Sequence, residues 1–493
     1  MPESENPITS EPSADAAPEP GAPLPEPDPG TRRSHAIAIA ASIVFFLIVA
    51  ILQGTGIQDR RKPDAEPNAG IEAIDQQLDI ALRFTIKMSH APLVGEQLRS
   101  DPETLRVLES WSKSPLERVY LAIAAAELSG PEAAIERLDQ ALEQADTEQL
   151  KDDIQTLEGI YRAALDGAEP MIDPAERQRL QDRHGYFARV ALTYPLAESD
   201  AARAALRSGA WGIGVMIFGV IAMVGAVLLG FILFAVAIVL LATGRLRRRA
   251  PRPIAGGSVF LETFAVFVGC FMCIKLAHLL AERFVPEDRL GSIFLALMGA
   301  QWLLLLTPLW PMARGMRFAD WRQAIGLHTG CGLLREMGCG VVAYLAALPL
   351  YVGAIVLTVL LLVIREAVTG GPVEAPSNPI VDLVSRADPL MLVLFFLMAT
   401  VWAPLCEEMI FRGAVYRHVR AYTPAVVAGL ISSVLFAFMH NYGPMLTPPL
   451  IALGFAFCMM REWRGSLVAS MTAHAMHNGA LLIVLFSLIR ALG

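Results

Sequence analysis

The sequence predicts an all-α membrane protein that crosses the bilayer about nine times and carries a helical extramembrane domain after its first span. Three observations predict this. The 493-residue chain is 54% hydrophobic and only 18% charged, with a mean hydropathy of +0.47. Its apolar residues gather in blocks of 18 or more, which is the length of a membrane helix. Between the first two blocks, apolar residues recur at helical spacing on a polar background.

The composition also excludes some classes of protein. The formal charge of −8 is small for this length and does not suggest nucleic acid as a partner. All six cysteines lie in or beside apolar blocks, so we expect no disulfide framework. Cys270 and Cys273 form a C-x-x-C within a predicted span, and we interpret them as two small apolar side chains on a helix.

The N-terminal part begins with a tail, residues 1–34, that is rich in Pro, Glu, Ala and Ser and is predicted to be disordered. Arg32 and Arg33 precede an apolar block, which is either a signal peptide or an uncleaved anchor. Because the block is long for a signal peptide, we favour a transmembrane anchor at 35–57. The twin arginines match an export signal only loosely.

Residues 58–208 form the predicted extramembrane domain, in which Leu78 and Leu82 share one helix face. Ser114-Pro115-Leu116-Glu117 predicts a helix start, with serine as N-cap and glutamate three positions on. A predicted helix–turn–helix follows, from Leu116 to Gln144. It is similar to one tetratricopeptide unit, but a single unit does not define a repeat, and a small helical bundle explains the pattern as well.

The remaining chain is predicted to be membrane, with additional spans at 209–317 and a core at 318–493. Eight apolar blocks follow the anchor, near 210–243, 258–280, 291–312, 338–364, 390–411, 424–441, 446–460 and 466–489. If all nine spans exist, the basic loops fall on the same side as Arg32 and Arg33, and that side should be cytoplasmic. We therefore expect an integral protein of a bacterial inner membrane, with a cytoplasmic N-terminus and residues 58–208 outside.

Ionisable residues are unevenly distributed among the spans. Such residues cost about 2.5–3.5 kcal/mol each on insertion scales, and they mark function or a buried pair. The first five spans hold few: Glu262, Lys275 and His278. The last four hold many more, namely Glu407, Glu408, Arg412, His440, His474 and His477, together with the polar amide of Asn478. We therefore expect a polar site among the last four helices.

Spacing sorts these residues by helix face. Glu408 and Arg412 are four apart and can pair, whereas Glu407 points about 100° away. His474 and Asn478 are also four apart. Three segments then each present a polar group on one face, as a site inside a helix bundle requires. A carboxylate shielded from water is a stronger base, a histidine can share its work on a water molecule, and an amide can donate to an oxyanion. This chemistry favours hydrolysis.

Together these motifs resemble a known family. Glu407-Glu408-x-x-x-Arg412, Phe436-x-x-x-His440 and His474-x-x-x-Asn478 are similar in order and spacing to the glutamate intramembrane proteases, the type II CAAX prenyl endopeptidases and bacteriocin-processing enzymes of the CPBP or Abi family. The resemblance covers residues 318–489, and "FADWRQAIGL" at 318–327 is similar to the entry into the family's core. It implies a membrane-embedded endopeptidase of metalloprotease type that acts on a peptide or protein within the lipid bilayer.

The resemblance also implies roles for single residues. Glu407 would activate water with His440, and His474 with Asn478 would stabilise the oxyanion. Glu408 and Arg412 would form a structural or substrate-orienting pair. Whether a divalent metal such as zinc takes part stays open; if one is present, Glu407, His440 and His474 would hold it, because Asn is a poor zinc ligand.

Other polar residues have simpler interpretations. We interpret His477 as a neighbour of the site, and Lys275 with His278 as snorkelling or packing groups. Arg417 and His418 are expected in the cytoplasmic interface. One expectation conflicts with the motif, since the predicted span boundaries put His440 near the outer face and Glu407 in the cytoplasmic half.

A second hypothesis has a different function class. The late-span polar groups would only fix helix packing, and the chain would be an inactive membrane scaffold whose domain 58–208 binds a partner protein. A transporter is a third option, but we find no inverted repeat and no paired broken helices.

Overall fold

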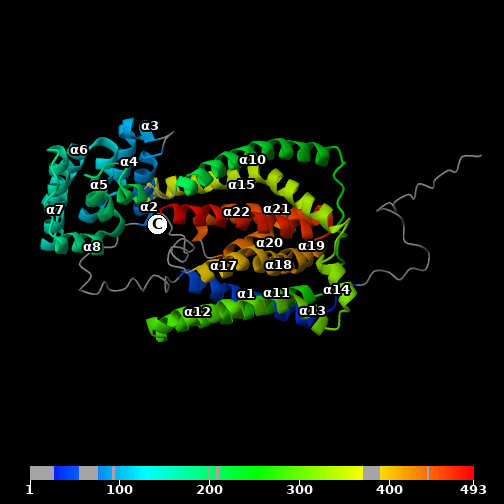
Figure 1. Cartoon of the computed structure of the whole chain (residues 1–493). Coiled ribbons are helices and arrows are strands. Elements are labelled where there is room, and N and C mark those ends of the chain that lie inside the picture. The colour runs from blue at the N-terminus through cyan, green and yellow to red at the C-terminus, as the bar shows by residue number, and fades with distance from the viewer. Residues whose placement is uncertain are drawn as a thin grey trace, which may run out of the picture.

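The computed structural model describes residues 27–54, 76–91, 95–197, 199–206, 210–369, 389–440 and 443–492. Every regular element in these ranges is a helix, which confirms the all-α prediction (Figure 1). The predicted disordered tail falls mostly on residues 1–26, which lie outside the described residues. Residues 27–30, in contrast, lie against the start of α11 (Val259–Phe284), where Pro29 O accepts hydrogen bonds from the backbone of Ser258 and Val259.

The helices of the predicted extramembrane domain gather at one end of the molecule (Figure 1). They are α2 (Gln76–Ser89), α3 (Gly95–Ser100), α4 (Pro102–Trp111), α5 (Pro115–Ser129), α6 (Pro131–Gln144), α7 (Glu148–Leu165), α8 (Pro174–Thr193) and α9 (Ala201–Leu206). Helix α5 lies at their centre and is buried almost all round. Ser114 and Glu117 form the predicted capping box at its start, and α5 with α6 is the predicted helix–turn–helix.

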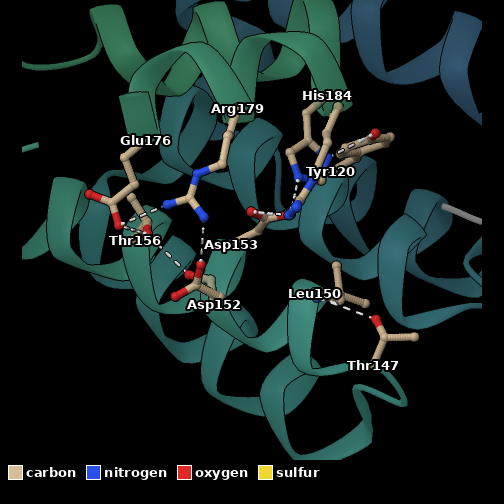
Figure 2. Close-up of polar contacts among 10 residues, drawn as sticks. Tyr120, Thr147, Leu150, Asp152, Asp153, Thr156, Glu176, Arg179 and His184 are labelled. Carbon is tan, nitrogen blue, oxygen red and sulfur yellow. Dashed lines mark hydrogen bonds and ion pairs between the residues drawn. The ribbon is translucent and has the colours of Figure 1, made fainter. Parts of the chain in front are cut away.

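Buried charges tie this domain together. Arg203 on α9 makes two 2.6 Å hydrogen bonds to Glu127 at the end of α5, and His90 adds a third at 3.0 Å. About two turns nearer the start of α5, the Tyr120 hydroxyl contacts His184 (Figure 2). The carboxylate of Asp153 lies 3.2 Å from His184 and 2.7 Å from Arg183. These contacts join four helices that are distant in sequence.

The remaining helices form the rest of the molecule. They are α1 (Arg32–Gly54), α10 (Ala210–Ala242), α11, α12 (Glu287–Gln301) continued by η2 (Trp302–Leu309) and α13 (Trp310–Ala313), α14 (Phe318–Ile325), α15 (Leu333–Thr369), α17 (Pro389–Leu397), η3 (Met398–Trp402), α18 (Ala403–Glu407), η4 (Glu408–Val415), α19 (Tyr416–Tyr422), α20 (Ala425–Phe438), α21 (Gly443–Arg464) and α22 (Val468–Leu492). The segments from α17 to α19 follow one another without a break.

The predicted count of nine spans is not confirmed. Within the described residues, six helices are long and apolar enough to cross a bilayer, at 218–242, 259–284, 289–313, 333–369, 390–422 and 468–487. Helices α1, α20 and α21 are not among them. Helix α20 has 14 residues and so spans only about 21 Å. Helix α21 contains Pro448 and Pro449 and ends in a charged stretch with Arg461, Glu462 and Arg464.

A network of arginine contacts holds one end of the membrane bundle. Arg464 makes two hydrogen bonds to Glu336 at the start of α15, and both side chains are buried. Glu462 accepts from Tyr416 and Arg420, and Arg417 pairs with Asp28 before α1. This end carries α14 and lies opposite the extramembrane helices (Figure 1). The predicted basic side and the domain are therefore at opposite ends of the bundle.

A glycine of α15 allows α22 to pack closely against it. A Cβ added at Gly340 would lie 2.4 Å from the backbone oxygen of Ala469, so only glycine fits at this crossing. Helix α22 carries His474 and Asn478, so this close approach sets where both side chains lie.

Candidate active site

The turn at Thr423-Pro424 brings Glu407 and His440 to the same depth. Glu407 lies 16 residues before Thr423, and His440 lies 16 residues after Pro424. The segments before and after the turn are helical and contain the same number of residues. Glu407 and His440 therefore lie at a similar distance from the turn. The conflict between span boundaries and motif arises because the first arm continues as α19 to Tyr422, well past the predicted span end at residue 411.

Glu407 lies between two histidines. Its Oε2 atom is 3.9 Å from Nε2 of His440 and 3.8 Å from Nε2 of His474. Glu407 and His474 are nearly buried, while about a quarter of the His440 side chain (25%) is exposed. Among the described residues, Glu407 Oε2 has no hydrogen-bond partner. Separations above 3.5 Å between polar atoms are typical of groups bridged by a water molecule.

The tautomer of His440 follows from its backbone contact. Nδ1 of His440 lies 2.8 Å from the backbone oxygen of Phe436. A carbonyl oxygen can only accept, so Nδ1 carries the hydrogen, and in the neutral ring Nε2 has a lone pair. Nε2 of His440 therefore faces Glu407 as a proton acceptor.

Glu408 lies on the other side of His474. Its Oε1 is 3.1 Å from Nδ1 of His474, and the same oxygen is 2.9 Å from Nη1 of Arg412. Glu408 and Arg412 are fully buried. The Arg412 nitrogens meet no acceptor at hydrogen-bonding angles among the described residues, so the pair is held by charge and proximity. Buried charges of this kind are tolerated when they are paired.

Two phenylalanines support this pair. The Arg412 guanidinium lies 4.3 Å from the ring centroid of Phe436 and 5.1 Å from that of Phe457, distances at which cation–π attraction is effective. Phe457 also stacks on the His474 ring at 5.2 Å. Phe457, on α21, was not singled out from the sequence, because one phenylalanine in an apolar span carries no signal of its own.

The helix that carries Glu407 is irregular on both sides of it. The segments η3 and η4 are π-helical and flank the short α18. Wider π turns displace backbone carbonyls from their usual partners and often occur at functional sites. Side chains from neighbouring helices donate hydrogen bonds to two carbonyl oxygens of these segments. Asn478 Nδ2 donates to Ala399 O at 2.7 Å, and Ser432 Oγ donates to Phe411 O at 2.8 Å.

Two of the predicted site residues, His440 and His474, therefore meet around Glu407, while others lie apart. Asn478 is one turn beyond His474, and its amide is bound to a backbone oxygen of η3. His477 points to α15 instead, where Nδ1 is 3.2 Å from the Tyr344 hydroxyl. His418 packs edge-on against His35 of α1 at 5.0 Å, away from Glu407.

The fit of a metal ion can be tested on these distances. Ligand atoms around tetrahedral zinc lie about 3.4 Å apart, given bonds of about 2.1 Å. The Glu407 oxygen is 3.8 and 3.9 Å from the two histidine nitrogens. In the described part of the chain, no group of three or more His, Cys, Asp or Glu side chains has the arrangement of a metal site. The three residues, as they are placed, therefore do not fit a zinc ion.

Comparison with protein families finds a match in the late helices. Residues 389–480 match the family model described as "Type II CAAX prenyl endopeptidase Rce1-like". No curated protein and no solved structure matched the chain in the corresponding searches. The matched range begins with α17 and includes Glu407, His440, His474 and Asn478, so all four predicted catalytic residues lie within it.

Proposed function

Because residues 389–480 form an Rce1-like domain of the type II CAAX prenyl endopeptidase family, we propose that the chain hydrolyses a peptide bond inside the membrane with a water activated by Glu407 and His440. One observation carries this proposal: Glu407 Oε2 faces Nε2 of both His440 and His474 at 3.8–3.9 Å and has no hydrogen-bond partner among the described residues.

The first step is activation of the water. A water between Glu407 and His440 donates one hydrogen to the carboxylate and the other to Nε2 of His440, since both atoms accept. Its lone pairs then point away from both groups, toward the carbonyl carbon of a bound peptide. As the water oxygen forms the new bond to carbon, its proton passes to Glu407 or His440, and the carbonyl oxygen becomes an oxyanion.

His474 is suited to stabilise that oxyanion. When Nδ1 donates to Glu408, protonation of Nε2 gives an imidazolium that lies between two carboxylates, and Nε2–H can donate to the developing charge. Arg412 is paired with Glu408 and balances its charge. His474 is therefore the residue that donates a hydrogen bond to the oxyanion. Asn478 would assist through its second amide hydrogen, because the first is bound to Ala399 O.

Collapse of the intermediate completes the reaction. The carbon–nitrogen bond breaks, and the proton held by Glu407 or His440 is transferred to the leaving nitrogen. The products are a new carboxyl terminus and a new amino terminus. The protons in these steps are balanced by the water, the peptide, Glu407 and His440.

The test replaces each acceptor in turn. Glu407→Gln keeps the shape but cannot take a proton, and we expect cleavage to fall at least about 10²-fold, with a similar loss for His440→Ala. Both variants should still insert in the membrane. Glu366→Gln, an exposed glutamate near the end of α15, is the matched control. Cleavage by the Glu407→Gln protein at the wild-type rate would rule the proposal out.

The substrate and the orientation are part of this proposal. A prenylated C-terminus is one candidate, and comparing the membrane proteomes of cells with wild type and with Glu407→Gln would identify the uncleaved peptide. We place the chain in a bacterial inner membrane with the basic end in the cytoplasm, because Arg417, Arg420 and Arg464 lie at the end opposite the domain. Labelling of single cysteines from either side of the membrane checks this orientation.

A scaffold function stays the alternative. The extramembrane helices have a hydrophobic core of their own around α5, separate from the clusters of the membrane bundle. A domain built in this way can bind a partner protein without any chemistry at Glu407. The scaffold hypothesis predicts that Glu407→Gln has no phenotype in cells and that residues 58–208 capture a defined protein.

A further inference from the structure

Lys275 is a charged residue within the membrane that the mechanism above does not use. It lies in the second half of α11, outside the family-matched range, and it is half-buried. Charged side chains within spans are rare and mark substrate paths or buried pairs. Glu282 lies two turns further along the same helix, and no carboxylate of the described residues forms an ion pair with Lys275.

The amine of Lys275 lies at the depth of Glu407. On α11, Phe264 and Phe267 both pack against Phe411, with ring centroids 6.0 and 6.2 Å apart. Helix α11 and the helix of Glu407 run in opposite directions, so one turn beyond Phe267 corresponds to one turn before Phe411. That turn carries Phe271 on one helix and Glu407 on the other.

The lysine folds back to this depth. Its Nζ lies 5.5 Å from the ring centroid of Phe271, one turn toward the start of α11. Phe271 packs on the cluster that contains Phe411 and Phe436, and the Phe436 ring lies 4.5 Å from that of His440. The amine of Lys275 therefore lies at the depth of the water-activating pair, on the α11 side of the aromatic cluster that contacts His440.

We propose that Lys275 binds a carboxylate of the substrate peptide close to the bond that is cut. This inference rests on the proposed function. An amine in an apolar setting favours an anionic partner, and no carboxylate of the described residues pairs with Lys275, so a carboxylate of the substrate can take that place. The carboxylate is supplied either by a free C-terminus or by an Asp or Glu side chain near it, and Lys275 selects for that charge.

Binding to an uncut complex gives the first test. The Glu407→Gln protein is titrated with three farnesylated peptides that end in Cys-Val-Ile-Met: the free acid, its amide, and an amide with Asp in place of the last residue. We expect the free acid to bind about 10- to 100-fold more tightly than the amide. Binding of the aspartyl amide as tightly as the free acid would show that a side-chain carboxylate suffices.

Variants then assign the effect to Lys275. In the Glu407→Gln background, Lys275→Met and Lys275→Gln should each remove the preference for the acid, and Lys275→Arg should keep it. Arg283→Met removes an exposed cation from the same helix, beside Phe284, and should leave the preference unchanged. Two neutral replacements of different polarity separate lost charge from altered packing.

The outcomes separate the two proposals. Equal binding of acid and amide, no binding of any peptide, or a preference that survives Lys275→Met would each overturn the role of Lys275. Cleavage of the free acid by wild type together with any of these results would leave the endopeptidase intact. A Lys275-dependent preference without cleavage by wild type would support the carboxylate site and count against the proposed function.

Discussion

At the scale of single residues, the pair Glu408–Arg412 determines how His474 lies. The i, i+4 spacing predicted that the two side chains meet, and their atoms are 2.9 Å apart. The spacing did not predict that Glu408 would contact His474 from another helix, or that Phe436 and Phe457 would hold the guanidinium. Those contacts depend on which helices are neighbours.

Removing one member of this pair should be strongly destabilising. Arg412→Met leaves the Glu408 carboxylate buried without its cation, and we expect a loss of about 3–5 kcal/mol in stability. Thermal unfolding in detergent measures this loss. The double variant Glu408→Gln/Arg412→Met should regain most of the stability, because no buried charge is left unpaired, but it should stay slow in cleavage because His474 loses its charged partner. A double variant no more stable than Arg412→Met would contradict this account.

At the scale of elements, two features position the site. The π-helical segments η3 and η4 flank Glu407, and α22 crosses α15 at Gly340. Neither could be read from hydropathy, because an apolar block looks the same whether its turns are α or π. The arginine contacts at the end of α21 show the same limit: the sequence shows the charges of Arg464 and Glu336, but not that they meet.

The crossing at Gly340 can be tested with a second glycine of the same helix. Gly340→Ala puts a Cβ 2.4 Å from the backbone oxygen of Ala469, so α22 has to move and His474 with it. We expect lower cleavage and a lower melting temperature. Gly353→Ala, also on α15, meets nothing within 4 Å and should be neutral or stabilising by up to about 1 kcal/mol. Equal effects of the two variants would show that the close crossing is unimportant.

At the scale of the whole molecule, a membrane bundle and an extramembrane domain each have their own core. In the domain, burial raises the pKa of Glu127, but hydrogen bonds from His90 and Arg203 and their charges outweigh burial and hold the pKa below its ordinary value. Burial likewise acts against the contacts of His184 and Arg183 at Asp153, whose pKa is also lowered. Both carboxylates therefore stabilise the folded domain in their charged form.

The lowered pKa values set the direction of the pH dependence. A carboxylate with a lowered pKa contributes stability that is fully present above its unfolded value, here 4.5 for glutamate and 3.8 for aspartate, and that is lost as the pH falls through the folded value. We expect amide protection factors in α5, corrected for intrinsic exchange, to fall when the full chain is moved from pH 6 to below about 4.

Glu127→Gln should lower the same protection factors already at pH 6, because Arg203 is left buried without its charged partner. Glu103→Gln is the control, since Glu103 pairs with Arg106 on the exposed surface, where ion pairs contribute about 0–1 kcal/mol. Unchanged protection in the Glu127→Gln protein would contradict a stabilising role for the buried pair.

The sequence by itself determined the helices and their character. Apolar blocks, the capping box at Ser114 and the spacing of Glu408 and Arg412 are local patterns, and helical periodicity turns each into a defined face. The tertiary structure alone decided that Glu407, His440 and His474 meet and that Asn478 binds Ala399. The physical reason is that turns, helix crossings and π segments set the depth and rotation of each face, and these depend on neighbours far apart in the chain.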